Sequence, residues 1–443
     1  MTDSPTSASN QKPLPYQKGS PEYRAMHTQL GLLAMSVIIN VIGFSIIFPI
    51  APYIVQHALG PGTNPNNPDI VKIAGWLSSV YALMQFFFAP IWGRLSDKIG
   101  RRPILMASLA GDVIFYTMFG FSHSLPMLFA SRILAGIFSS GSLAVAQAYA
   151  ADVTTPEHRA AGLGMIGASF GVGFVFGPAL GGLLGSHNLS LPLFVSAGLA
   201  LTNLVFIKFW LPEPTRPPQE NNSQAAPAPA SGRIASMAKA MKSELWYLFL
   251  LTFLVTLSFA FLEGTFNGYL MQHFHYTKQS STVQQGLVFT YLGVILVLVQ
   301  GGAIRPLVKR FGEAPLVIAG IGLMAIGFAL FPLANNLAIL MLGPLLPITI
   351  GNGLNTPALR ALISRKSAVT AQGGSLGLSA SFDSLARAIG PGTASWMYAQ
   401  FGQRVPYLGA AVIMAIAWLF AFTKRRQLAA TIDAPSSTLG VSH

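Results

Sequence analysis

Five ionisable residues lie inside long apolar stretches of this 443-residue sequence, and their side chains are the best placed to do chemistry. These residues are Asp112, Arg132, Glu263, Asp383 and Arg387. A charged side chain inside hydrocarbon costs ~3 kcal/mol unless it is paired or hydrated, so each position predicts an ion pair or a functional site. Proton transfer is the chemistry that buried carboxyl groups do in such surroundings, which makes Asp112 and Glu263 candidate proton carriers.

Each of these residues also has a structural interpretation. Asp112 and Glu263 can each take a basic partner from another helix, and Arg132 is the partner we consider for Asp112. Arg132 stays charged at any accessible pH, so it can interact with a neighbouring acid or bind an anionic group of a substrate. Asp383 and Arg387 stand four residues apart, a spacing that puts them on one helix face and predicts a structural ion pair.

Long apolar segments surround these residues and indicate that the chain crosses a membrane. The sequence is 52% hydrophobic and only 9% charged, whereas soluble domains are ~25% charged. A hydrocarbon core takes ~20 helical residues to cross. The segments long enough to do so are 29–55, 70–92, 103–121, 125–150, 160–185, 190–211, 244–272, 283–303, 314–333, 336–359, 370–399 and 405–423. The sequence therefore predicts an all-α membrane protein with twelve transmembrane helices.

The lysine and arginine residues outside these segments indicate how the chain is inserted. With the N-terminus inside, nearly all of them fall on the inner side, and only Lys72, Lys278 and Arg404 fall on the outer side. This asymmetry predicts a multi-pass protein of the cell membrane, inner or plasma, with both termini cytoplasmic. The net charge of +13 is then a topology signal, and we expect the lipid bilayer, not nucleic acid, as a partner.

A polar stretch divides the chain into two similar halves. We expect a disordered tail at 1–28, a six-helix bundle at 29–211, a flexible cytoplasmic linker at 212–243, a second six-helix bundle at 244–423 and a tail at 424–443. The pattern of residues 93–100 recurs at 305–312, and Gly177-Pro178 recurs as Gly390-Pro391 at nearly the same offset. Such pseudo-repeats enclose a central site near the membrane midplane and expose it alternately by rocking.

Several motifs resemble those of a known transporter family. The segment Gly93-Arg-Leu-Ser-Asp97-Lys-Ile-Gly100-Arg101-Arg102-Pro103 is similar to the loop signature of the major facilitator superfamily, between its second and third helices. The segments that resemble its drug:proton antiporter branch, especially the tetracycline exporters, are 81–90, 132–136, 171–182 and 381–391. The resemblance implies the twelve-helix fold of this superfamily and transport of small molecules.

The loop motif implies a conformational latch made of Gly93, Asp97, Gly100, Arg101 and Arg102. Asp97 is an acid among basic residues, and it can pair with a loop arginine or with the positive end of a packed helix. The resemblance implies span eleven as the partner, in a contact that forms in one conformation and breaks in the other. The alternative is that the basic residues only fix the topology.

The fifth span carries a motif with two roles open. Gly173, Gly177, Pro178, Gly181 and Gly182 resemble the helix-five motif of exporters. Glycine lets helices approach closely, and proline removes a backbone donor and bends a helix. The sequence is compatible with close packing and with a gating bend.

Two positions depart from the pattern of the tetracycline exporters. Those proteins typically carry an acid on the first helix where this chain has Asn40. Their acid on the third helix falls at the position of Phe115, one turn after Asp112. One turn keeps the same helix face, so the change is compatible with an acid that is displaced rather than lost. The two departures leave the identity of the substrate open.

Polar and aromatic residues inside the spans are candidates for the substrate cavity. They are Asn40, Gln85, Phe86, Gln147, Asn267, Tyr269, Tyr291, Asn352 and Asn355. A pocket with much aromatic surface and few polar groups suits lipophilic or amphipathic ligands.

The sequence thus predicts a secondary active transporter that works by alternating access. Proton-coupled export of lipophilic or amphipathic molecules is the main hypothesis, and a carrier of sugars, lysolipids or other metabolites stays open, as does a receptor. No nucleophile–base pair, nucleotide-binding loop or His-rich metal motif is recognisable, and the chain has no cysteine. We therefore expect no enzyme activity, no cofactor and no metal, and a monomer whose partners are its substrate, protons and lipid.

Overall fold

The computed structural model describes residues 20–60, 63–64, 67–154, 156–214, 230–367 and 372–429, and within these ranges the secondary structure is helical with no strand. The helices before residue 214 are α1 (Pro21–Ser45), α2 (Ala51–Leu59), α3 (Pro68–Ile99), α4 (Arg101–Gly120), α5 (Leu125–Val153), α6 (Pro156–His187) and α7 (Leu191–Trp210). The later ones are α8 (Ala230–Ala240), α9 (Trp246–His273), α10 (Lys278–Leu298), α11 (Ile304–Phe311), α12 (Glu313–Leu330), α13 (Leu337–Leu340), α14 (Leu346–Lys366), α15 (Gln372–Phe401), α16 (Val405–Thr423) and α17 (Arg425–Ala429).

Most of these helices are long and apolar enough to cross a membrane. In the described residues, 10 helical segments meet this criterion by length and composition. Two further helices are as long: α6 has 32 residues and α15 has 30, and they fall where the sequence predicts the fifth and eleventh spans. The structure is thus an all-helical membrane fold.

Polar caps and glycines set the ends of several helices. The Ser20 hydroxyl accepts a hydrogen bond from the backbone amide of Tyr23 at the start of α1, and Asn67 caps α3 in the same way. Gly100, at φ 115°, separates α3 from α4, and Gly312, at φ 80°, separates α11 from α12. Both glycines take a backbone conformation that other residues rarely adopt, so the two similar sequence segments make similar tight connections.

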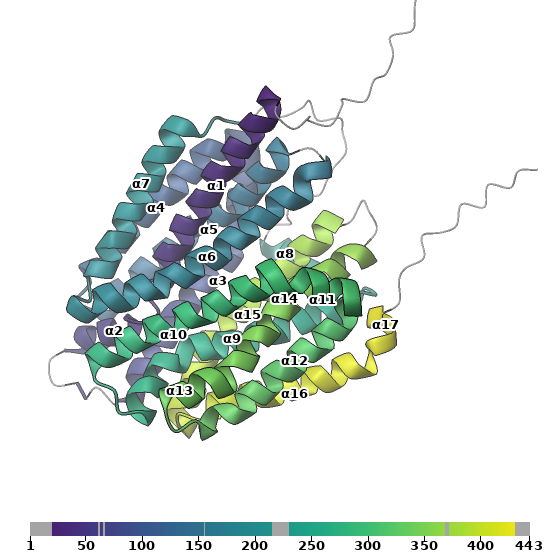
Figure 1. Ribbon diagram of the computed structural model, residues 1–443. Helices are drawn as coiled ribbons and strands as arrows, with labels where there is room; N and C mark the ends of the chain where they lie inside the picture. The colour runs from purple at the N-terminus through teal and green to yellow at the C-terminus, as the bar shows by residue number, and fades with distance from the viewer. Residues whose placement is uncertain are drawn as a thin grey trace, which may run out of the picture.

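The helices form two groups, each with its own packing. In the N-terminal group, α1 packs on α6 and α7, and α4 packs on α5 and α7; in the C-terminal group, α9 packs on α15, and α12 packs on α14 and α16. Figure 1 shows the two groups side by side, with α10 lying along α6. Two helix pairs, α3 with α15 and α6 with α10, join the groups.

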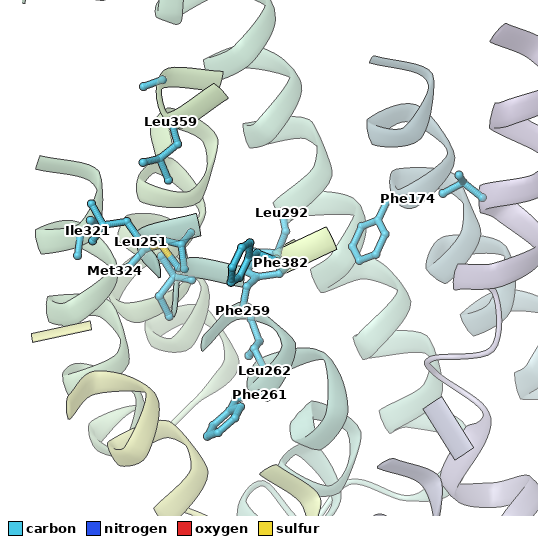
Figure 2. Close-up of a cluster of buried hydrophobic side chains, with 14 of the residues drawn as sticks. Phe174, Leu251, Phe259, Phe261, Leu262, Leu292, Ile321, Met324, Leu359 and Phe382 are labelled. Atoms are coloured by element: carbon cyan, nitrogen blue, oxygen red, sulfur yellow. The ribbon is translucent and has the colours of Figure 1, made fainter. Parts of the chain in front are cut away.

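A large apolar core runs through both groups. Figure 2 shows part of it, with Leu251, Phe259 and Phe382 among its buried members and Phe174 on the neighbouring α6. The link is aromatic, because Phe174 contacts Phe48 and Phe289, with ring centroids 5.8 and 6.1 Å away. These rings close the space between the groups with apolar surface.

Two predicted boundaries are wrong, and the predicted linker contains a helix. The first helix begins at Pro21, so the expected tail at 1–28 is too long; its residues 1–19 lie outside the described part. The expected span 29–55 is broken by a turn at 46–50, because Pro49 has no amide to continue the helix. The linker 212–243 contains α8, and its residues 215–229 lie outside the described part.

The eighth and tenth spans contain short π-helical segments. Val299–Ala303 links α10 to α11, and Met341–Leu345 links α13 to α14. Each insertion shifts the helix register by one residue, a local distortion that is often found near functional sites. These two helical spans also run beyond the predicted ends, to Phe311 and Lys366.

Candidate functional site

Asp112 lies in the middle of the N-terminal group, on α4, and its residue surface is 1% exposed. The side-chain amide of Asn40, on α1, donates a hydrogen bond of 2.9 Å to Oδ2 of Asp112. Ser139 and Arg132, both on α5, also interact with this carboxyl. Its second oxygen, Oδ1, accepts no hydrogen bond from the described residues. One oxygen of this deeply buried carboxyl can therefore still accept a hydrogen bond or a proton.

Arg132 lies beside this carboxyl and is 4% exposed. Its guanidinium carbon lies 4.3 Å from the ring centre of Phe119 and 5.4 Å from that of Tyr81, so ring faces stabilise part of its charge. Its Nη2 atom makes no hydrogen bond to the described residues. The ion pair considered between Arg132 and Asp112 is not formed in the described part of the chain, where the direct partner of Asp112 is Asn40.

A series of hydrogen-bonded polar side chains on α3 and α5 supports the site. The hydroxyl of Tyr81 donates to Ser139 over 2.9 Å, and the amide of Gln85 donates to Tyr81 over 3.1 Å. These bonds fix the ring that faces Arg132. Sequence reasoning did not select Tyr81, Ser139 or Phe119, although the segment from Tyr81 to Gln85 belongs to the antiporter-like stretch.

A narrow cavity opens next to Arg132. It is lined by Phe44, Ile47, Phe48, Ala51, Leu77, Ser78, Tyr81, Phe119 and Arg132. The free space accommodates a group about the size of one water molecule. Aromatic surface thus surrounds a single cationic side chain.

The C-terminal group holds its own buried acid, and here the acid is paired. Arg387 on α15 donates from Nη1 to both carboxylate oxygens of Glu263 on α9, at 3.0 and 3.1 Å. Asp383 pairs with Arg360 at 3.6 Å and accepts a 2.6 Å hydrogen bond from Thr256. Asp383 still attracts Arg387 along α15, but the prediction of a pair confined to one helix was incomplete, because each residue has an ionic partner on a neighbouring helix.

A second cavity lies beside Asp383 and is more polar than the first. It is lined by Thr252, Val255, Thr256, Thr356, Leu359, Arg360 and Asp383. Sequence reasoning assigned Arg360 to topology alone, and no signal in its spacing indicated a pathway residue. Its lining includes three threonines, an arginine and an acid, whereas apolar side chains form most of the lining of the first cavity.

Close backbone contacts join the two groups at one end of the molecule. The end of the molecule where α1 begins and α16 ends is called the termini end. The contacts lie at the other end, where α3 begins and α15 ends, and we call it the opposite end. A Cβ atom on Gly75 would lie 2.5 Å from the carbonyl oxygen of Pro391, and one on Gly182 would lie 2.7 Å from that of Thr282. A larger side chain at Gly75 would push α3 away from α15, and one at Gly182 would push α6 away from α10.

Hydrogen bonds reinforce this contact. The amide of Asn267 donates to the carbonyl of Pro49 at 3.2 Å and to Gln285 at 2.7 Å, and Tyr53 bonds to Ser281. The amide of Gly392 donates to Ser79 over 2.8 Å. Asn267, predicted to line the cavity, therefore lies in the seam between the groups.

The residues of the helix-five motif pack against two different neighbouring segments of the chain. Cβ atoms on Gly173 and Gly177 would lie 2.8 and 3.0 Å from the carbonyl oxygens of Ile38 and Ile42 on α1, and Gly181 faces Ile46 in the turn that follows α1. Gly182 faces α10, and the carbonyl of Pro178 lies against Gly286 there. The first three glycines thus pack within the N-terminal group, whereas Pro178 and Gly182 pack across the seam; the gating bend stays a prediction.

The loop motif makes its described contacts within the N-terminal group. Arg101 pairs with Asp97 and with Asp152 of α5, at 2.8 Å each. The carboxylate of Glu213 accepts hydrogen bonds from the backbone amides of Arg101 and Arg102, at 2.5 and 2.9 Å. The carbonyl of Gly93 accepts from Ser96, and Gly100 makes the turn. Span eleven supplies none of these contacts in this conformation.

The other predicted cavity residues are dispersed. Phe86 is part of the apolar core, Gln147 is exposed and Asn352 is half-buried. The hydroxyl of Tyr269 donates to the Phe331 carbonyl, and that of Tyr291 to the Met341 carbonyl. Asn355 is buried against Met324. Of the predicted set, Asn40 and Gln85 lie in the charged site with Asp112 and Arg132.

Comparisons with known proteins agree with this fold. Residues 33–305 and 248–438 match the family model of the Major Facilitator Superfamily. The chain is 33% identical to the class C tetracycline resistance protein of Escherichia coli over 82% of this chain and 88% of that one. The crystal structure of the human organic anion transporter MFSD10 is 25% identical, has a TM-score of 0.68 and covers 91% of this chain and 100% of its own.

A further structure extends the likeness of fold. It is an inward-facing, unoccupied bacterial homologue of the human lysosomal transporter Spinster, 15% identical, with a TM-score of 0.69 over 93% of this chain and 98% of that one. The paired long helices, the glycine-set loops and the family match lead to one assignment: the chain belongs to the Major Facilitator Superfamily and resembles its tetracycline exporters.

Proposed function

We propose that this chain is a proton-coupled secondary transporter that exports lipophilic or amphipathic small molecules by alternating access. The proposed transporter has twelve membrane spans in two halves of six helices each. These spans are the 10 long apolar helical segments of the described residues, together with α6 and α15. Both termini lie in the cytoplasm of a cell whose inner or plasma membrane holds the protein as a monomer. The asymmetric distribution of lysine and arginine supports this orientation.

The observation that carries the proposal is a buried charged site in a chain whose two halves meet closely at one end. Glycine contacts and neutral hydrogen bonds join the halves at the opposite end. In the proposed orientation that end faces outside, so this conformation receives substrate from the cytoplasm. Rocking of the halves would separate the seam and release the substrate outside.

Asp112 is the proton carrier that the geometry favours. It is buried and has one carboxylate oxygen without a hydrogen bond in the described residues. Glu263 is held by Arg387, and in this conformation its charge is compensated. Arg132 lies beside Asp112 and responds to its charge, so it completes the coupling site.

The loop motif acts as the latch of this cycle. In the conformation described, Asp97 engages Arg101; we propose that it moves to span eleven when the termini end closes. Asp97→Asn keeps the size and removes the charge, and it should abolish transport while expression and folding stay normal. Retained transport by this variant would refute the latch.

A carrier of hydroxylated metabolites, such as sugars, is the second candidate. The threonine hydroxyls, Arg360 and Asp383 of the second cavity favour it, because a sugar needs several polar contacts.

Transport in proteoliposomes with an imposed pH gradient tests the two candidates together. Purified full-length protein would be supplied with lipophilic drugs, amphipathic anions and sugars. We expect drug movement against the proton flow, which Asp112→Asn uncouples and Arg360→Gln, in the second cavity, leaves coupled. Drug movement that ignores the gradient would contradict the proposal, and gradient-driven sugar movement alone would establish the second candidate.

A further inference from the structure

The short helix α11 has an apolar face and a basic face. None of its residues is buried in the described structure. One face carries residues that recur at helical spacing, namely Ile304, Leu307, Val308 and Phe311. The other face is exposed and carries Arg305, Lys309 and Arg310. A basic amphipathic helix of this kind is typical of a segment that meets a membrane surface.

The position of α11 along its span places it at the level of the lipid headgroups. It ends the helical segment Gln279–Phe311, which has 33 residues. This segment starts at the opposite end, where Thr282 contacts Gly182 in the seam. A hydrocarbon core takes only ~20 helical residues to cross, so the remainder of the segment, which includes α11, extends into the headgroup region.

The three cations of α11 have no acidic partner in the described part of the chain. Neither an ion pair nor a side-chain hydrogen bond engages Arg305 or Lys309 there. Arg310 lies over the ring of Phe311, 5.3 Å from its centre. The nearest acid along the chain is Glu313, and Arg365 pairs with it at 2.9 Å. The charge of α11 is thus left for a partner outside the described residues.

The equivalent segment of the N-terminal half has its charge compensated. Both segments end at a glycine, and three residues before it the first has Asp97 where the second has Lys309. Asp97 pairs with Arg101 at 2.8 Å. Membrane orientation depends on how many basic residues lie on one side, not on their position around a helix. Topology alone therefore does not explain why these cations share one face.

We propose that the basic face of α11 binds the headgroups of anionic phospholipids through Arg305, Lys309 and Arg310. Lipid phosphate accepts charge-assisted hydrogen bonds from arginine and lysine. A basic residue near an anionic membrane surface strengthens the interaction by about fivefold. The proposal concerns the lipid around the protein and does not depend on which substrate is carried or on proton coupling.

Fluorescence quenching by lipid in nanodiscs that contain the full chain tests the proposal. Since the chain has no cysteine, Gly302→Cys carries a single bimane label next to α11. Gly302 is exposed, and nothing lies within 4 Å of a Cβ atom there. The nanodiscs hold equal amounts of phosphatidylcholine and phosphatidylglycerol, and one of the two is brominated in its acyl chains. The ratio of quenching in the two samples measures the preference for the anionic lipid.

We expect phosphatidylglycerol to be preferred by about fivefold or more next to the label. The triple variant Arg305→Gln/Lys309→Gln/Arg310→Gln should reduce this preference to less than about twofold. Its thermal midpoint should not change, because these side chains are exposed. Equal quenching by both lipids in the labelled chain, or an unchanged preference in the triple variant, would overturn the proposal.

A matched control removes the same number of charges elsewhere. The variant Lys208→Gln/Lys239→Gln/Lys242→Gln changes exposed residues on α7, on α8 and just after α8. The preference at the label should stay within about twofold of the unmodified value. A loss equal to that of the triple variant on α11 would mean a general attraction by net charge and would contradict a site on this helix.

A single substitution and a soluble anion sharpen the result. Lys309→Asp gives this segment the acid that its counterpart has, one turn from Arg305, so it should lower the preference more than Lys309→Gln does. Inorganic phosphate and chloride at equal ionic strength should weaken the preference equally, by screening. A loss with phosphate alone would assign the basic face to a soluble phosphate compound and would overturn the assignment to lipid.

Discussion

The two halves of the molecule treat a membrane-buried carboxyl in different ways. In the C-terminal group, Glu263 receives two hydrogen bonds from Arg387. In the N-terminal group, Asp112 and Arg132 are more deeply buried, yet Asp112 bonds to neutral Asn40 and both keep an atom without a hydrogen bond in the described residues. An acid and an arginine thus form a hydrogen-bonded ion pair in one half, whereas in the other half they interact without hydrogen-bonding to each other.

The difference indicates where function lies. A closed ion pair holds two helices together and has little capacity for another ligand, since its charges already neutralise each other. Charges that are held near one another without pairing can still accept a proton or bind an anion. Asp112 and Glu263 are both buried, and it is the completeness of their contacts that distinguishes them.

Breaking the C-terminal pair should have the largest effect on stability. Arg387→Met leaves Glu263 buried without its cation, and we expect a loss of ~3 kcal/mol in the free energy of unfolding. The double variant Glu263→Leu/Arg387→Met removes both charges and should recover most of it. Thermal unfolding in detergent measures both. A double variant as unstable as the single one would show that the pair is not the cause.

Separating the halves should have the next largest effect. Gly75→Ala places a methyl group against the Pro391 carbonyl, and overpacking of this kind costs ~2 kcal/mol. We expect the opposite end to open more often. Since the chain has no cysteine, alkylation of a single Val71→Cys reporter, a position buried there, should speed up by about tenfold or more.

The matched control for this prediction is Gly171→Ala. Gly171 is also a helical glycine, but nothing lies within 4 Å of a Cβ atom there. Alkylation of the same reporter should not change. Equal rates in Gly75→Ala and Gly171→Ala would contradict the account of the seam.

Adding a second acid to the N-terminal site should have a smaller effect that depends on pH. Asn40→Asp puts two carboxyls about as close as the present 2.9 Å hydrogen bond, and such a pair must share a proton. Destabilisation of ~1–2 kcal/mol is expected at pH 8, where both tend to ionise, and less at pH 5. The thermal midpoints at the two pH values, compared with Asn40→Ser, check this; a loss that is equal at both would contradict it.

Removing the acid should have the smallest effect on stability. Asp112→Asn keeps the shape and removes a buried carboxyl that is only partly hydrogen-bonded, so the free energy of unfolding should change by less than ~1 kcal/mol. Its effect should appear in transport, which should lose its dependence on the pH gradient. A loss of stability as large as that of Arg387→Met would erase the contrast between the halves.

The sequence predicted the helices well because apolar length is a local property. The buried acids could also be found, since a charge within an apolar run is visible without a structure. Their partners could not: Asn40 and Asp112 are 72 residues apart, and Glu263 and Arg387 are 124 apart. The rotation of α15 about its axis, which is set by packing on α3 and α9, decides which neighbour Arg387 meets.

Pocket residues were predicted less well for the same reason. Tyr269 and Asn267 are both polar residues within spans. Helix packing places Tyr269 in the C-terminal core and Asn267 in the seam between the groups. Tyr81 and Phe119 were missed because a buried aromatic residue is usually core. Only their position around Arg132 distinguishes them.

The seam at the opposite end is held by neutral groups: the Asn267 amide, hydroxyls and backbone carbonyls. When the halves part, solvent can take over each of these bonds, and the exchange costs only about 0.5–1.5 kcal/mol per bond. An ion pair in the same place would be slower to hydrate and more sensitive to salt. This seam should therefore open and reseal at similar rates over a wide range of ionic strength.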